Sequence, residues 1–193
     1  AMMEVYQTVH GNPSSSHAVG RRAKALVETS RRSIAQHLNC PARSICFTSG
    51  GTEADNHALQ AAVSCLNVTR IITSLAEHSA VIKASQNAGA DGVEVVHVQH
   101  LSDGAVDLDH LEQLLSDSQA KTLVTLMHAN NEVGVILDIH KVGAMCKAHG
   151  ALFHSDTVQT MGHYALDLSE LNIDFLACSA HKFHGPKGAG FLY

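Results

Sequence analysis

The sequence predicts an α/β fold of three layers, α/β/α, in which helices cover both faces of a mostly parallel central sheet. Short apolar runs of strand length alternate with helical segments of about ten residues or more, the pattern of βαβ units. The strand segments are almost continuously apolar, as expected where helices cover both faces of a sheet. No linker, repeat or low-complexity tract interrupts residues 1–193, so we predict a single domain.

The predicted elements follow one another along the chain. The first helix can be capped by Ser14-Ser15-Ser16, runs to about Leu38 and stops before Pro41. Gly89 is the expected C-cap of the third helix, because glycine accepts the left-handed conformation that often ends helices. The remaining helices are predicted over residues 52–66, 78–88, 108–115 and 138–149. Strands are predicted over residues 44–48, 70–74, 92–98, 121–127, 151–155 and 173–177, with another beginning at Gly190.

Composition and charge exclude several classes of function. The net charge is -5 and the basic residues are scattered, so no nucleic-acid partner is predicted. No apolar run approaches the roughly 18 residues that a membrane helix needs, so no membrane partner is predicted. The five cysteines are widely spaced and form no C-x-x-C, which favours a reducing cytoplasm over a disulfide framework. The 15 histidines form no H-E-x-x-H motif, so no dedicated metal site is predicted.

Parallel sheets bind ligands at the carboxyl ends of their strands. In this chain those positions follow Thr48, Ser74, Met127, Ser155 and Ala177. Each is followed by residues that could do chemistry, and each of these segments also has a purely structural interpretation.

The first two strand ends carry a glycine turn and a histidine. Gly51 and Thr52 open a helix, where backbone N–H groups and a hydroxyl can cradle a phosphate. A turn with a threonine N-cap would look the same. His78 could stack on a planar ring or move protons, or it could simply cap a helix. Asn130, after the Met127 strand end, could contact polar ligand atoms or belong to an asparagine-rich turn.

An acid and an amine follow the last two of these strand ends. Asp156 ends a buried strand, which is costly unless the carboxylate caps the next segment or meets a cation such as a protonated ring nitrogen. Lys182 precedes a Gly/Pro-rich turn and suits a Schiff-base lysine, although a surface lysine or a glycine phosphate loop is an alternative. Together these groups are what pyridoxal 5′-phosphate (PLP) requires, so we predict a PLP site.

The order and spacing of these motifs resemble one family over nearly the whole chain. The motifs are Gly11–His17, Phe47–Asn56, Glu77-His78, Asn130–Gly134 and Ser179–Lys182. They resemble the NifS/IscS-type cysteine desulfurases, in the class V aminotransferase group of fold-type I PLP enzymes.

This resemblance implies roles for the matching residues. Lys182 would form the Schiff base, and His78 would stack on the ring and transfer protons, which makes these two the catalytic residues. Asp156 would pair with the pyridinium nitrogen, while Gln159 and Asn130 would contact the ring oxygen and the substrate side. The implied phosphate-binding residues are Gly51, Thr52, Ser179 and His181.

The resemblance implies a PLP-dependent cysteine desulfurase, which is a sulfurtransferase. It would convert L-cysteine to L-alanine and place the sulfur on an enzyme cysteine as a persulfide. Acceptor or scaffold proteins of iron–sulfur cluster assembly or thio-modification would receive that sulfur from a cytoplasmic homodimer. A selenocysteine lyase or a related class V aminotransferase is an alternative, and a non-catalytic truncated module is another.

The chain also departs from the family pattern. In the family, the persulfide cysteine and the arginine that binds the substrate carboxylate lie C-terminal to the lysine, whereas this sequence extends 11 residues past Lys182. We therefore expect a truncated, cofactor-binding portion that lacks the family's N-terminal segment and C-terminal small domain. We also expect the five cysteines to be structural and the chain alone to show no turnover.

Overall fold

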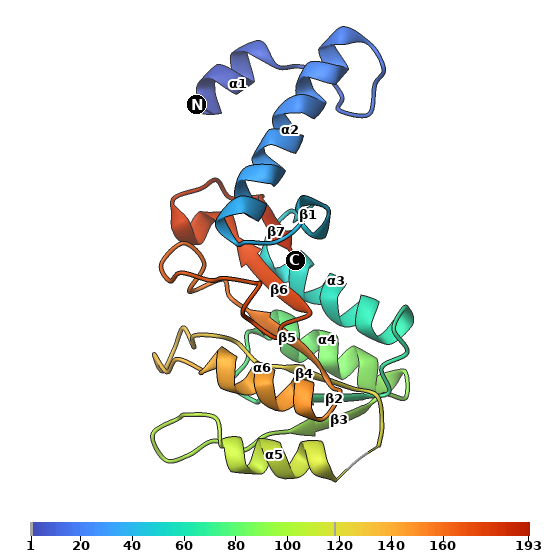
Figure 1. The fold of residues 1–193 in the computed structure, drawn as a ribbon, viewed down its shortest axis with the longest axis vertical. Coiled ribbons are helices and arrows are strands. Elements are labelled where there is room, and N and C mark those ends of the chain that lie inside the picture. The colour runs from blue at the N-terminus through green and yellow to red at the C-terminus, as the bar shows by residue number, and fades with distance from the viewer. Residues whose placement is uncertain (1, 118) are drawn as a thin grey trace. The chain divides into compact units, whose positions relative to one another are not determined.

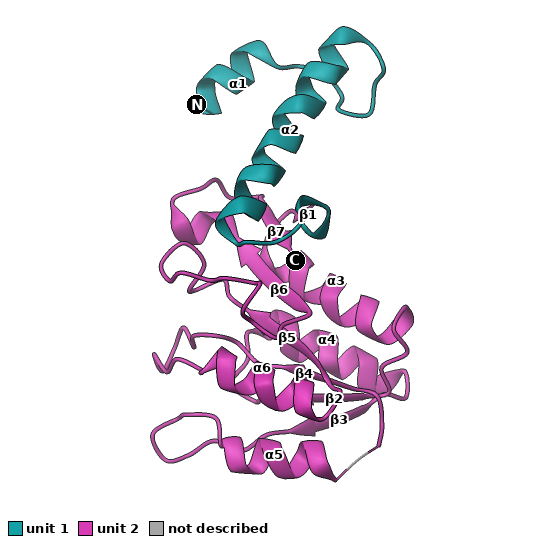
Figure 2. Cartoon of the chain, viewed as in Figure 1, with its two compact units in different colours: residues 1–45 teal, residues 46–193 magenta. Residues whose placement is uncertain are grey.

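The computed structural model describes residues 2–117 and 119–193, which divide into two compact units rather than one. Unit 1 covers residues 1–45 and unit 2 covers residues 46–193 (Figure 2). Unit 1 contains helices α1 (Met2–Thr8) and α2 (Ala18–His37) and the 3-10 turn η1 (Ala42–Ser44). Helix α1 buries no residue and α2 buries only small ones, so unit 1 has little core of its own, and the single domain expected from the sequence stays a prediction.

Helix α2 begins later than its sequence predicted. The side chain of His17 caps it, with Nδ1 accepting a hydrogen bond from the Gly20 N–H at 3.2 Å. The serines at 14–16 precede this cap and lie outside the helix. Helix α1 was not predicted from the sequence at all.

Unit 2 is built on a seven-stranded sheet in the order β1-β7-β6-β5-β4-β2-β3. Strand β7 pairs antiparallel with both β1 and β6, and the other pairings are parallel. Strand β1 therefore runs in the same direction as β6, and the predicted mostly parallel sheet is confirmed. The strands are β1 (Cys46–Thr48), β2 (Arg70–Thr73), β3 (Glu94–His97), β4 (Thr122–Thr125), β5 (Leu152–Asp156), β6 (Phe175–Ser179) and β7 (Gly190–Leu192).

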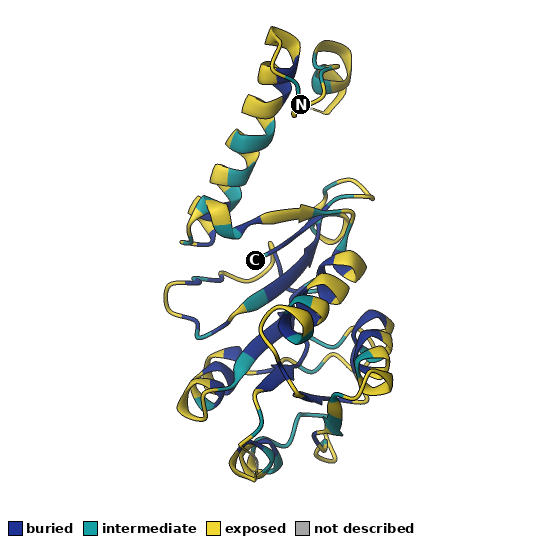
Figure 3. Cartoon of the chain, turned by 90° about the vertical axis from the view of Figure 1, so that its right-hand side faces the viewer, coloured by how far each residue is buried: buried dark blue, intermediate teal, exposed yellow. Residues whose placement is uncertain are grey.

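Helices cover both faces of this sheet, as predicted. Helices α3 (Gly51–Ser64) and α4 (Ser79–Ala90) lie on one face, and α5 (Leu108–Ser116) and α6 (Ile139–Ala148) lie on the other (Figures 1 and 3). Right-handed crossovers explain this division. The connections through α3 and α4 move along the strand order toward β3, and those through α5 and α6 move back in the opposite direction, so the two pairs of helices lie on opposite faces. The strands between the two helical layers are the most buried part of unit 2 (Figure 3).

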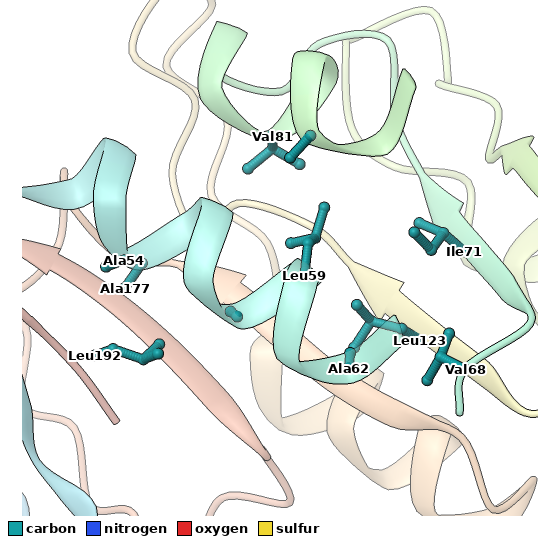
Figure 4. Packing of buried hydrophobic residues seen from close by; sticks show 11 residues of the cluster. Ala54, Leu59, Ala62, Val68, Ile71, Val81, Leu123, Ala177 and Leu192 are labelled. Atoms are coloured by element: carbon teal, nitrogen blue, oxygen red, sulfur yellow. The ribbon is translucent and has the colours of Figure 1, made fainter. Parts of the chain in front are cut away.

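A cluster of buried apolar residues lies between α3, α4 and the sheet (Figure 4). Three alanines of α3, Ala54, Ala58 and Ala62, are completely buried. They recur every four residues, so they form one small-residue stripe that lets α3 approach the sheet closely. Leu59 and Ile71 fill the space beside this stripe, and each buried side chain of this size contributes about 1.5–3 kcal/mol.

Element boundaries differ from the sequence prediction by a few residues. Gly89 lies inside α4 and is not its C-cap. Asp91 takes that place, and the glycine with a left-handed backbone is Gly92, with φ of 95°. Helix α6 ends at Ala148, one residue before the predicted end at His149, and Gly150 follows with φ of 66°. Among the described residues, no helix has the length and apolar character needed to cross a bilayer.

Candidate functional site

One cavity of about 160 Å³ gathers residues that follow five different strands. These strands are β1, β2, β4, β5 and β6, which all point the same way in the sheet. The cavity therefore lies where the sequence placed the chemistry, at the carboxyl ends of the parallel strands. Its lining residues are Gly51, Thr52, Asp55, His78, Met127, Asn131, Asp156, Val158, Gln159, Ser179, His181 and Lys182.

Eight of the nine residues predicted to bind the cofactor line this cavity. The ninth, Asn130, lines a neighbouring cavity. Its Oδ1 accepts hydrogen bonds from the N–H groups of Glu132 and Val133 at 2.8 and 3.0 Å, and its Nδ2 donates to the Ala76 carbonyl at 2.7 Å. Asn130 thus uses its amide to hold the turn, and Asn131 lines the candidate site in its place. The residue types at 130 and 131 are identical, so the sequence offered no way to choose between them.

The start of α3 forms one wall of the cavity. A Cβ atom on Gly51 would lie 2.5 Å from Cγ2 of Val158, so only glycine lets α3 approach the segment after β5 this closely. Gly50 precedes the helix without a side-chain cap. The first N–H groups of α3 therefore remain available to an anion, which the positive end of the helix dipole favours.

A second hollow of about 310 Å³ adjoins the cavity beside the start of α3. The two share four lining residues, Gly51, Thr52, Ser179 and His181, which are the four predicted to hold a phosphate. Ser179 and His181 are joined by a hydrogen bond of 2.8 Å between Oγ and Nδ1. Lys187 also lines the second hollow and adds positive charge there.

Lys182 lies in the 3-10 turn η2 (Ala180–Phe183), directly after β6. Its side chain is exposed, but its backbone is held from two sides. Nε2 of His163 lies 3.0 Å from the Lys182 carbonyl oxygen. Gly162, with φ of 79°, packs against Phe183, and a Cβ atom on this glycine would lie 2.8 Å from the Cβ of Phe183. The turn therefore fixes the lysine backbone while leaving the amine free to react.

Asp156 ends β5 and is buried at the cavity wall. Its Oδ1 accepts a hydrogen bond from the Val158 N–H at 2.8 Å. Burial is the main cause that raises the pKa of Asp156 to about 6, and the nearby carboxylate of Asp55 raises it further. Among residues 2–117 and 119–193, no lysine or arginine forms an ion pair with it. A cationic ligand would compensate this buried carboxylate.

His78 follows β2, and its side chain both caps a helix and lines the cavity. Its Nδ1 caps α4 by accepting a hydrogen bond from the Ala80 N–H at 3.2 Å, and its ring lines the cavity. Because Nδ1 acts as an acceptor, the proton of the neutral ring is on Nε2. Nε2 is then the nitrogen left for contact with a ligand.

Sequence reasoning missed four residues that line the cavity, namely Asp55, Met127, Asn131 and Val158, and the one with ionisable chemistry among them is Asp55. It is 1% exposed and lines the cavity from α3. The available signal was its spacing: Asp55 lies three and four residues before the inward-facing Ala58 and Leu59, so an acid occupies the apolar face of the helix. Carboxylate and ring-nitrogen atoms of Asp55, His78 and Asp156 all lie within 4.8 Å of one another, a spacing that could also hold a metal ion. The absence of a dedicated metal site stays a prediction.

The chain is similar to known proteins over its entire length. Residues 1–193 match the family described as "Aminotransferase class-V". The cysteine desulfurase IscS of Histophilus somni (strain 2336) is 41% identical over 186 residues, which cover 95% of this chain and 46% of that protein. Among solved structures, a NifS-like protein superposes with a TM-score of 0.94 at 37% identity, covering 100% of this chain and 53% of that one.

A solved structure of SspA in complex with cysteine superposes with a TM-score of 0.91 at 30% identity. The match covers 99% of this chain and 55% of that one. The chain thus spans about half the length of the relatives and solved structures that it matches.

Proposed function

This chain belongs to the class V aminotransferase family, and on that premise we propose that it is the cofactor-binding portion of a PLP-dependent cysteine desulfurase acting on L-cysteine. The observation that carries the proposal is the single cavity into which five strand ends bring an amine, an acid, a histidine and an anion cradle. These are the groups that PLP needs.

The residues that line the cavity fit both the ring nitrogen and the phosphate group of PLP. The buried Asp156 has no lysine or arginine partner among the described residues, and a protonated pyridine nitrogen would supply the missing positive charge. The uncapped start of α3, with Gly51 held against Val158, offers backbone N–H groups to a phosphate. Ser179 at the end of β6 and His181 in η2 would complete that phosphate site.

When bound, PLP supplies an electron sink for negative charge that develops on the amino acid. Lys182 would hold the cofactor through its amine, and Asp156 would hold the proton at the ring nitrogen. His78 would lie against the ring and move protons through Nε2, because its Nδ1 is occupied by the cap of α4. Gln159 and Asn131 would contact the ring oxygen and the substrate side, with Asn131 replacing Asn130 in the role expected from the sequence.

None of the five cysteines lines the cavity. Cys146 and Cys178 are buried, and burial raises the pKa of both thiols, to about 12 for Cys146, so neither is a ready nucleophile. We therefore assign the persulfide to a thiol other than these five and expect no turnover from this chain alone. A cytoplasmic homodimer that delivers sulfur for iron–sulfur cluster assembly or thio-modification completes the proposal.

Spectral titration of the full chain tests this function. PLP is added first, then L-cysteine, L-serine, L-alanine or L-selenocysteine, and the visible absorption is followed after each addition. We expect L-cysteine to change the spectrum at the lowest concentration. A stronger response to L-selenocysteine would favour a selenocysteine lyase and contradict the proposal, as would an equal response to all four amino acids.

A further inference from the structure

A buried row of polar side chains runs from the sheet to the wall of the cavity. Thr125 of β4 contacts His154 of β5, with 2.8 Å between Oγ1 and Nδ1. On the other side of the ring, Nε2 of His154 lies 3.5 Å from Oδ1 of Asp55 on α3. The exposed fraction of each of these three side chains is 1% or less. Water therefore does not compensate the charge or the hydrogen bonds of these groups.

Asp55 and His154 face each other in the part of the chain that the structure describes. Neither Oδ1 of Asp55 nor Nε2 of His154 has a hydrogen-bond partner within ordinary geometry. Leaving two such atoms buried and unpaired is costly, and a small approach of one to the other would satisfy both. If the Thr125 hydroxyl donates to Nδ1, the ring proton is on Nε2 and points toward Asp55.

Asp156 belongs to the same cluster. His154 and Asp156 are two residues apart on β5, so their side chains point to the same face of the sheet, the face that α3 covers. Oxygens of Asp55 and Asp156 lie within 4.8 Å of each other. Two buried carboxylates at this separation cannot both be charged unless something offsets one of them.

We propose that Asp55 and His154 are positioning residues for Asp156: His154 holds a proton against Asp55 and offsets its charge, so that Asp156 alone presents a negative charge to a bound pyridine nitrogen. This inference rests on the proposed function, because it concerns the group that would face the PLP ring. Asp55 in turn lines the cavity together with Asp156.

The electrostatic surroundings of Asp156 agree with this arrangement. After burial, Asp55 is the next cause that raises the pKa of Asp156, whereas the Val158 N–H, His154 and His78 lower it. Without His154, the charges of the two carboxylates would repel each other and the pKa of Asp156 would rise. Without Asp55, that repulsion would be absent and the pKa of Asp156 would fall. The other titratable groups around Asp156 are Glu77, Cys178, His181 and Lys182.

The first test needs no change to the pair itself. NMR of ¹⁵N-histidine-labelled full chain, without cofactor, reports which ring nitrogen of His154 carries the proton. The signal is assigned as the one whose Nδ1 shift moves in Thr125→Val. We expect a proton on Nε2 throughout neutral pH. A proton on Nδ1 alone would overturn the proposal, because Nε2 would then have nothing to offer Asp55.

The second test follows the carboxyl carbon of Asp156 in ¹³C-aspartate-labelled full chain. We expect His154→Gln to raise the pKa of Asp156 and Asp55→Asn to lower it, each by about one pH unit or more. The double variant should return close to the unaltered value. The control is Asp107→Asn at the N-cap of α5, where the asparagine oxygen can still accept the cap hydrogen bonds, and it should leave the pKa of Asp156 unchanged. A folded variant of either residue with an unmoved Asp156 pKa would overturn the proposal.

A binding experiment separates this inference from the proposed function. Pyridoxamine 5′-phosphate carries the ring nitrogen, and its analogue with carbon in that position does not. We expect His154→Gln to reduce the preference for the nitrogen-containing ring several-fold. If the unaltered chain bound neither compound, the proposed function would fail, while the two NMR measurements would still decide on the pair. An unchanged preference in a folded His154→Gln variant would count against the pair.

Discussion

The imidazole Nε2 of His163 lies 3.0 Å from the backbone carbonyl oxygen of Lys182. This contact ties the loop before residue 165 to the turn that carries the candidate Schiff-base lysine, without involving the lysine side chain. It therefore offers a way to disturb the position of the amine while keeping the amine itself.

Replacing His163 should loosen the lysine turn. We expect His163→Ala to weaken PLP binding by about two- to tenfold, the worth of one ordinary hydrogen bond, and His163→Gln to restore part of it. Equilibrium dialysis with PLP measures the effect. His149→Ala is the control, because that histidine pairs with Glu112 of α5 and neither residue lines the cavity. Equal losses from both alanine variants would contradict a specific role for His163.

A larger residue in place of Gly51 should clash with the segment after β5, against which α3 packs. The Cβ of Gly51→Ala would lie 2.5 Å from Val158, so we expect a loss of about 1–3 kcal/mol in stability and weaker PLP binding. Adding Val158→Ala should recover much of both. Gly89→Ala is a matched control inside α4, where the new Cβ meets nothing closer than 3.4 Å. Denaturant unfolding of these three variants measures the effect, and no recovery on adding Val158→Ala would contradict the steric explanation.

Alanine substitutions of the two neighbouring asparagines should affect different properties, PLP binding in one case and stability in the other. We expect Asn131→Ala to weaken PLP binding about tenfold with little change in stability, because this side chain is exposed at the cavity. We expect Asn130→Ala to cost about 1–3 kcal/mol of stability, because three hydrogen bonds of the turn are lost. Thermal unfolding and PLP dialysis on both variants check this, and the reverse pattern would contradict the assignment.

Glu77 should make the fold less stable as the pH rises. Burial raises its pKa to about 8, so the folded chain keeps a proton that the unfolded chain releases near its ordinary value of 4.5. Between these values the folded state binds more protons, and stability falls with increasing pH. The raised pKa of Asp156 gives a slope of the same sign up to pH about 6, and the lowered pKa of His128 gives a slope of the opposite sign up to its ordinary value of 6.5. The part due to Glu77 between pH 6 and 8 is therefore the difference between the unaltered chain and a variant that lacks the Glu77 carboxyl.

The variant Glu77→Gln should flatten that slope between pH 6 and 8. Urea unfolding at several pH values measures it, with the exposed Glu132→Gln as the control. If Glu77→Gln retained the full slope, the raised pKa of Glu77 would not be its source.

Much of this structure could be predicted from the sequence, because local patterns dictate it. Apolar runs that alternate with helices predict the sheet, and the rule that parallel sheets bind ligands at the carboxyl ends of their strands predicts where the cavity lies. The pattern could not show that β7 runs antiparallel, since a short apolar run at Gly190 reads the same in either direction. It also gave no sign of α1, which buries nothing and so has no apolar periodicity.

The finer features of the site depend on contacts between distant segments. Asp55 became part of the site only because α3 packs over β5, and His154 only because it lies two residues before Asp156 on the same strand face. The choice of Asn131 over Asn130 depends on which amide the turn uses for its own hydrogen bonds. Helical spacing could place Asp55 on the inward face of α3, whereas its partners there and the choice between the two asparagines are decided by tertiary structure.

The central claim is that Lys182 anchors PLP in this cavity. The full chain is incubated with PLP, reduced with borohydride, digested, and searched by mass spectrometry for the phosphopyridoxyl group. Lys182→Ala and Lys187→Ala serve as a matched pair, because Lys187 lines the adjoining hollow. We expect the label on Lys182, its loss in Lys182→Ala and its retention in Lys187→Ala. A label on Lys187 or scattered over surface lysines, unchanged in Lys182→Ala, would contradict the claim.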